Sequence, residues 1–208
     1  MKKYLPLFLF LAYLAVSCSP SPEKKAEALI KEAVLKTLVL PETYQSVETK
    51  LDSAFTPIHD PKSISAILDL FQNNQKMELV EEHIKYAKSQ IALWSSPLMK
   101  STTYGREQYQ QAKEEYDSYQ ETYEKLSINN EQRLEEIGKL FNKQPEYIGY
   151  RAHHRFRAND NDGTVYLSGY YFLFDKELSQ IVAQWDEEDI DTYNEILKQA
   201  QDAFQGQQ

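Results

Sequence analysis

Two stretches of the sequence carry the same seven-residue apolar pattern, and this pattern constrains the fold more than any other feature. In the first stretch the pattern falls at Met77, Val80, Ile84, Ala87, Ile91 and Trp94. In the second it falls at Tyr109, Ala112, Tyr116, Tyr119, Tyr123 and Leu126. Apolar residues spaced alternately by three and four positions are typical of helices that pack as a coiled coil. Since a short break separates the two stretches, they predict an antiparallel helical hairpin over about residues 62–142.

The turn of this hairpin sets which residues face each other. We expect the turn near Lys100, which places Ile91 opposite the Tyr109 region and Met77 opposite Tyr123. The tyrosines of the second stretch have two interpretations: they fill the interface between the helices, or they form an aromatic surface that recruits a partner.

The start of the hairpin and two weak points inside it can also be read from the sequence. Asp60 followed by Pro61 is typical of a helix N-terminus, with the aspartate as cap. Asn73 and Asn74 favour a kink in the first helix, and residues 127–130 favour an interruption in the second, because asparagine and serine compete with helical hydrogen bonding.

Outside the hairpin, the sequence predicts four strands and two helices. The strands lie at about residues 44–55, 147–158, 164–174 and 180–185, and the helices at about 22–38 and from Asp186 onward. This order predicts an α+β fold: a four-stranded antiparallel sheet with packed N- and C-terminal helices and the hairpin inserted after the first strand. In outline it resembles cystatin-like and nuclear-transport-factor-like folds. We expect a single domain over residues 23–208.

Details of the strands follow from their alternation. The first strand should bury the face formed by Val47, Thr49, Leu51, Ser53 and Phe55. The second strand is followed by Asp160-Asn161-Asp162-Gly163, which predicts a tight turn. The same four residues resemble the middle of a calcium loop, but the flanking positions that should supply oxygen ligands are Ala158 and Gly169.

The first 22 residues predict a lipoprotein signal and tether. Lys2 and Lys3 precede an uncharged apolar segment over residues 5–16. As a helix this segment would be about 18 Å long, which is too short to span a bilayer and typical of a signal peptide. Leu14-Ala15-Val16-Ser17-Cys18 resembles a bacterial lipobox, so we expect cleavage after residue 17, acyl chains such as palmitate on Cys18, and a short tether over residues 18–22. Ser19, rather than aspartate, after the cysteine favours the outer membrane.

Two further stretches carry a family resemblance. Residues 41–55 (PETYQSVETKLDSAF) and 147–158 (YIGYRAHHRFRA) are similar to segments of uncharacterised lipoproteins of Bacteroides-type bacteria. The resemblance implies lipoprotein character and no particular activity.

The charge balance excludes one class of partner. The formal net charge is −9, and removal of Lys2 and Lys3 with the signal peptide would make it −11. An acidic surface does not suit the phosphate backbone of nucleic acids, so we expect no nucleic-acid binding.

The chain offers few residues for chemistry. It contains 6 glycines and no phosphate-binding loop, serine elbow, paired cysteines or zinc motif, so we expect no cofactor, no metal and no catalysis. Arg151, His153, Arg155 and Arg157 fall on one side of the second predicted strand and form a candidate anion or ligand site. The alternative is a solvated face that pairs with the protein's own acids. His153 and His154 should point to opposite faces.

These observations favour a membrane-anchored bacterial lipoprotein, held in the outer membrane by acylated Cys18. We expect a non-catalytic binding or assembly module that engages an envelope protein partner through the hairpin. The alternative is a small-ligand or glycan binder that uses the arginine-rich face of the sheet.

Overall fold

The structure is a computed structural model that describes residues 20–205. The expected signal peptide and Cys18 lie outside the described residues. The elements in chain order are α2 (Pro22–Thr37), η1 (Pro41–Thr43), β1 (Gln45–Phe55), α3 (Pro61–Trp94), α4 (Pro97–Lys100), α5 (Thr103–Phe141), β2 (Tyr147–Asn159), β3 (Val165–Phe174), β4 (Ile181–Asp186) and α6 (Glu187–Gln205). The predicted α+β class and element order are confirmed.

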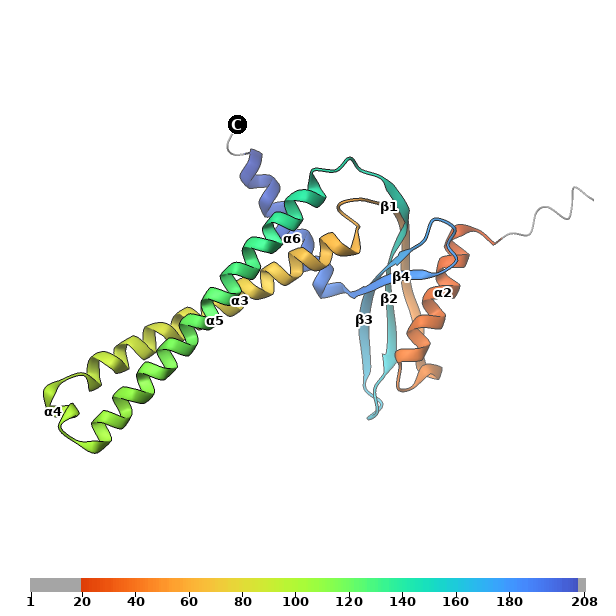
Figure 1. The fold of residues 1–208 in the computed structure, drawn as a ribbon. Helices are drawn as coiled ribbons and strands as arrows, with labels where there is room; N and C mark the ends of the chain where they lie inside the picture. The colour runs from red at the N-terminus through yellow and green to blue at the C-terminus, as the bar shows by residue number, and fades with distance from the viewer. Residues whose placement is uncertain (1–19, 206–208) are drawn as a thin grey trace, which may run out of the picture. The chain divides into compact units, whose positions relative to one another are not determined.

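The four strands form one antiparallel sheet in the order β1-β2-β3-β4, with α2 lying along one face (Figure 1). Ser21 caps α2 by accepting a hydrogen bond from the backbone N–H of Lys24. The core between helix and sheet joins side chains from α2, β2 and β3 with one residue that follows β3. Its buried members are Ala26, Ile30, Val34, Ala152, Phe156, Ala158, Phe172, Phe174 and Leu178.

The strict alternation predicted for β1 is wrong at both ends of the strand. The register against β2 shifts between Ser46 and Glu48 and again between Ala54 and Phe55. Each irregularity inserts a residue into the ladder and changes which side chains face the core. Val47 and Phe55, which lie at these irregularities, are exposed.

The hairpin consists of α3, α4 and α5, and its two long helices pack against each other along the predicted seams. Ile84, Ala87 and Ala112 are buried, and the other seam positions are at least partly buried. Asp60 caps α3 by accepting from the backbone N–H of Lys62, as expected. Tyrosines of the α5 seam contact α3, where Tyr119 stacks on His83. The interpretation of the tyrosines as interface residues is therefore confirmed.

Both long helices are continuous across these positions, so the interruption predicted in the second helix is absent. The asparagines pair with each other instead: Asn73 donates to Asn129 at 3.2 Å, and Asn130 donates to Asn74 at 2.7 Å. Helical hydrogen bonding prevails because the amides find partners across the seam.

The predicted facing of the helices is displaced by about one helical turn. Met77 contacts Asn130 rather than Tyr123, and Tyr123 reaches Glu81. The cause is the connection, where the short helix α4 moves the centre of the hairpin from Lys100 toward Thr102.

The chain divides into two compact units. One contains the residues up to His59 together with Glu146–Asp191, and so includes the sheet and α2. The other contains Asp60–Pro145 and the residues from Thr192 onward, and so includes the hairpin and most of α6. No helix within the described range is long and apolar enough to cross a membrane.

Candidate functional site

The four basic residues singled out in the sequence lie on the face of β2 opposite the core. Ala152, His154 and Phe156 are buried, whereas Arg157 is exposed and its neighbours on the same side are partly exposed. The register of β2 against β1 and β3 places this row in the middle of the sheet. The structure therefore brings Arg151, His153, Arg155 and Arg157 together on one strand face, as the sequence predicted.

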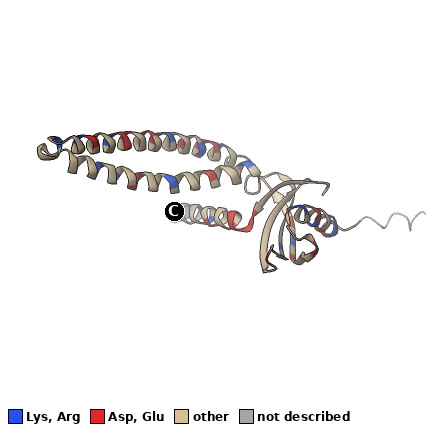
Figure 2. Cartoon of the chain, turned by 90° about the horizontal axis from the view of Figure 1, so that it is seen from below, with Lys and Arg blue, Asp and Glu red and all other residues tan. Residues whose placement is uncertain are grey.

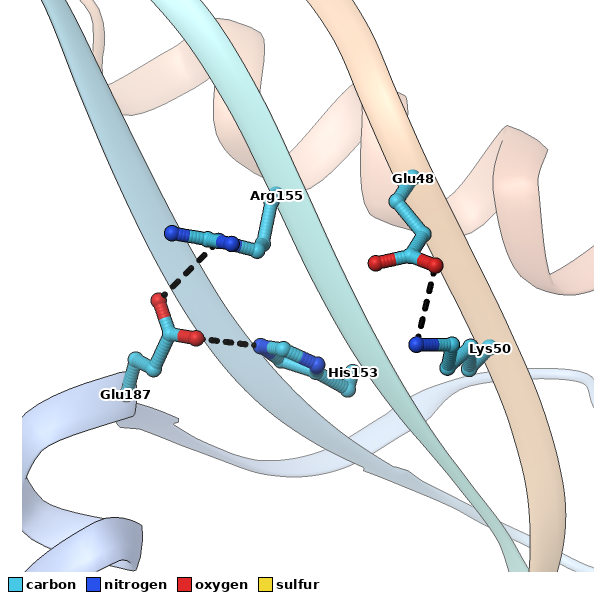
Figure 3. A network of polar contacts seen from close by, with 5 residues as sticks. All are labelled: Glu48, Lys50, His153, Arg155 and Glu187. Carbon is cyan, nitrogen blue, oxygen red and sulfur yellow. Dashed lines mark hydrogen bonds and ion pairs between the residues drawn. The ribbon is translucent and has the colours of Figure 1, made fainter.

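An acidic side chain from α6 occupies the centre of this face. Glu187 Oε1 lies 2.8 Å from His153 Nε2, and Glu187 Oε2 lies 3.5 Å from Arg155 Nε (Figure 3). Arg155 Nε is buried and has no hydrogen-bond partner, so its attraction to Glu187 is an ion pair without hydrogen-bond geometry. One carboxylate thus holds two of the four basic residues.

A glycine makes room for this carboxylate. Gly169 pairs with Arg155 across the β2–β3 ladder, and a Cβ atom built there would collide with the carboxylate of Glu187. Beside it, the ring of Tyr171 stacks on His153 at a centroid distance of 4.4 Å. Glycine inside a strand commonly marks a close approach by another group, and here that group is Glu187.

Acids of β1 flank the same face. Lys50 pairs with Glu48 at 2.9 Å, and Arg151 lies 3.9 Å from Asp52. The hydrogen bond from Lys50 is the main cause that lowers the pKa of Glu48. Since these contacts are largely exposed to solvent, each contributes little to stability.

A shallow pocket of about 290 Å³ opens beside Glu187. It is lined by Arg155, Leu167, Ser168, Gly169, Asp186, Glu187 and Glu188. Three carboxylates and one guanidinium give the pocket an acidic lining, which disfavours an anion. The anion site stays a prediction. Among the described residues Arg157 forms no ion pair, and Arg151 forms only the long contact to Asp52.

His154 lies on the opposite face and is 2% exposed. Its Nε2 is 3.0 Å from the hydroxyl of Tyr44 and its Nδ1 is 2.9 Å from the hydroxyl of Thr49. Burial lowers the pKa of His154, which favours the neutral ring. A neutral ring can donate from one nitrogen and accept at the other, so the two hydroxyls satisfy it.

The acidic turn after β2 closes a hairpin between β2 and β3, as predicted. Its carboxylates accept hydrogen bonds from the turn's own backbone: Asp160 from Asp162 and Thr164, and Asp162 from Thr164. Gly163 adopts a φ of +85°, which glycine accommodates without strain. In the part of the chain that the structure describes, no cluster of three acids, histidines or cysteines is arranged to hold a metal ion.

The hairpin tip, residues 91–106, exposes apolar side chains. Leu98 is 76% exposed, Tyr104 61% and Leu93 52%. The ring of Trp94 meets that of Tyr104 edge to face at 5.7 Å, which joins the ends of α3 and α5. The exposed side chains of the tip differ from those of the seam, where the apolar side chains face the opposite helix.

Sequence reasoning did not find the role of Glu187. The run of acids after Trp185 is typical of a helix N-terminus, which favours negative charge, and so does not indicate a contact with the sheet. The available signal was Gly169, a glycine within an aromatic strand, but its spatial neighbour could not be known from the sequence.

Comparison with protein-family models, with curated proteins and with solved structures found no significant match.

Proposed function

We propose that this protein is a lipid-anchored component of the bacterial cell envelope, attached through acylated Cys18, that uses its hairpin as a non-catalytic binding arm. The lipobox-like sequence before Cys18 supports the anchor. Helix α2 begins at Pro22, four positions after Cys18, so the lipid would hold the sheet unit close to its membrane. The outer membrane is the proposed location, because Ser19 follows the cysteine.

The exposed tip at the end of a closed hairpin is the observation that carries the proposal. α3 has 34 residues and α5 has 39. At about 1.5 Å per residue, α3 alone is about 50 Å long. Since the seam residues already join the two helices, the side chains of Leu93 and Leu98 are not needed to hold the hairpin together. We infer that these side chains serve contact with a second component of the envelope.

The two histidines of β2 support a non-catalytic role. General acid–base catalysis needs a group that can reach a substrate proton. His154 is sealed in the core by Tyr44 and Thr49, and His153 is held by Glu187. The ring of His154 is therefore kept from a substrate by burial, and the ring of His153 has one nitrogen engaged by Glu187 and is stacked on Tyr171.

The test separates the arm from the anchor. Residues 1–18 are replaced by a cleavable secretion signal without a cysteine, so that the protein is secreted but not acylated. A second version also has residues 85–117 replaced by a short glycine-rich turn, which keeps the His83–Tyr119 stack and the Asn74–Asn130 bond. Envelopes from the native host are then sedimented and probed for each protein.

The secreted protein with the intact hairpin should sediment with envelopes, and the shortened one should stay soluble. A matched control, Arg157→Ala in the intact version, should sediment like the parent because Arg157 lies on the sheet. Complete solubility of the intact, unacylated protein would show that the arm binds no envelope component.

A further inference from the structure

The hairpin tip combines apolar and basic residues in an otherwise acidic protein. Between His83 and Arg106 the sequence contains no aspartate or glutamate, although the whole chain has a net charge of −9. The loop end of the hairpin accordingly shows basic and uncharged residues in Figure 2. Acids resume at Glu107, so the excess of positive charge is confined to the end of the hairpin.

The tip is held in one conformation by its own polar contacts. Ser96 caps α4 by accepting from the backbone N–H of Met99. Arg106 donates to the carbonyls of Lys100 and Ser101 at 3.1 and 3.3 Å. Gly105 lies so close to the carbonyl of Met99 that no side chain would fit there. These contacts fix α4 with Leu98 facing solvent.

The cations of the tip are not neutralised. In residues 20–205, neither Lys100 nor Arg106 forms an ion pair with a carboxylate, and Lys100 lies over the ring of Tyr109 at 4.1 Å. A preformed tip that carries exposed leucines, a tryptophan–tyrosine pair and two cations without a carboxylate partner has the composition of segments that enter the headgroup layer of a membrane.

We propose that the hairpin tip binds the surface of an anionic lipid bilayer, with Leu98 inserted among the acyl chains and Lys100 and Arg106 at the level of the lipid phosphates. This deepens the proposed function by naming the component that the arm contacts, and it rests on that function for its biological meaning. A lipid anchor on Cys18 and an inserting hairpin tip would attach the protein to membrane at two points.

A bilayer fits the tip better than a protein does. A stable protein interface takes about 800 Å² from each partner, spread over 20 to 30 residues. The tip exposes only three large apolar side chains, those of Leu93, Leu98 and Tyr104, and they lie on a projection rather than in a groove. A second copy of the chain is disfavoured because tip-to-tip contact would bring like charges together.

The test uses a protein that consists of residues 19–208. It contains all the residues that the structure describes and lacks Cys18. Because Cys18 is the only cysteine of the chain, Leu98→Cys introduces a single thiol that takes an environment-sensitive fluorophore. Leu79→Cys is the matched control, since Leu79 is 59% exposed on α3 but lies outside the tip. Each labelled protein is mixed with vesicles of phosphatidylcholine alone or with added phosphatidylglycerol.

Phosphatidylglycerol vesicles should shift the emission of the label at position 98 to shorter wavelength and leave the label at position 79 unchanged. In unlabelled protein, Leu98→Ser should weaken vesicle sedimentation about tenfold and Leu79→Ser should not change it. Raising the salt concentration should reduce binding, because the headgroup attraction is screened. Circular dichroism should show unchanged helix content in all variants.

An unshifted label at position 98, equal shifts at both positions, or equal binding to vesicles without phosphatidylglycerol would overturn the proposal. The outcome can be separated from that of the proposed function. If the hairpin carries the protein to envelopes but the tip ignores vesicles, the arm binds a protein, and the proposed function stands without this inference.

Discussion

Asn130 donates a hydrogen bond to Asn74 across the hairpin seam at 2.7 Å, from a position that is only 8% exposed. The carbonyl oxygen of Asn130 is buried without a hydrogen-bond partner. A buried asparagine in a coiled-coil seam fixes how two helices pair and lowers their stability, because the amide is only partly satisfied. We infer that this pair reinforces the facing of α3 and α5 that the connection through α4 sets.

Asn130→Leu should therefore stabilise the hairpin by about 1 kcal/mol, since it removes the unsatisfied oxygen and adds apolar contact. Urea unfolding followed by circular dichroism measures the change. Asn129→Leu is the control and should be nearly neutral, because Asn129 is exposed. A lower stability for Asn130→Leu would mean that the bond to Asn74 outweighs the burial of the amide.

Gly169→Ala should displace the Glu187 carboxylate from its place over the sheet. The added methyl group collides with the end of the Glu187 side chain, so the carboxylate must turn away from His153 and Arg155. We expect a loss of about 1 kcal/mol in the free energy of unfolding. Glu187→Gln should give a similar loss.

The two changes should not add, because they remove the same contacts. The measurement is a double-mutant cycle by chemical denaturation of Gly169→Ala, Glu187→Gln and the double variant. Losses that add fully would show that Gly169 serves the strand for a reason unrelated to Glu187.

The sheet unit should lose stability as the pH falls from about 6.5 to about 4. Burial is the main cause that lowers the pKa of His59 to about 4, and the charge of Arg151 adds to it, whereas the charge of Asp52 acts in the opposite sense. The pKa of His154 is lowered too. A histidine whose pKa is depressed by folding binds its proton more readily in the unfolded chain, so acid favours unfolding.

Urea midpoints measured between pH 7 and pH 4 should fall, and His59→Asn should reduce the slope. Asparagine can still accept the hydrogen bond from Phe55 but does not titrate in this range. An unchanged slope in His59→Asn would assign the acid sensitivity to other groups.

Cys18→Ser should abolish incorporation of radiolabelled palmitate in growing cells. The reason is chemical, since Cys18 supplies the only thiol in the sequence. The variant should also lose lipid modification in a mass spectrum of the purified protein. Ser17→Ala leaves the thiol and keeps a small residue before it, so it should be labelled like the parent.

Much of the fold could be predicted because its patterns are local. Periods of 3.5 and 2 residues mark the side of a helix or strand that is buried, whatever it packs against. The hairpin seams, the α2 stripe and the alternation of β2 follow from such periods, as does the placement of Arg151 and His153 on one face. Val47 and Phe55 were placed wrongly because a bulge depends on how two strands meet and leaves no period.

The sequence by itself determined which elements form, which faces they bury and that a lipobox-like segment precedes them. Tertiary structure alone decided what each face meets. Asn130, where the sequence predicts an interruption, instead pairs with Asn74 inside a continuous helix, and α4 set the facing of the helices. The approach of Glu187 over Gly169 paired two of the four predicted site residues internally. Such contacts join positions that are far apart in the chain. Their energies depend on distances in the folded protein, which cannot be read from the spacing of residues along the sequence.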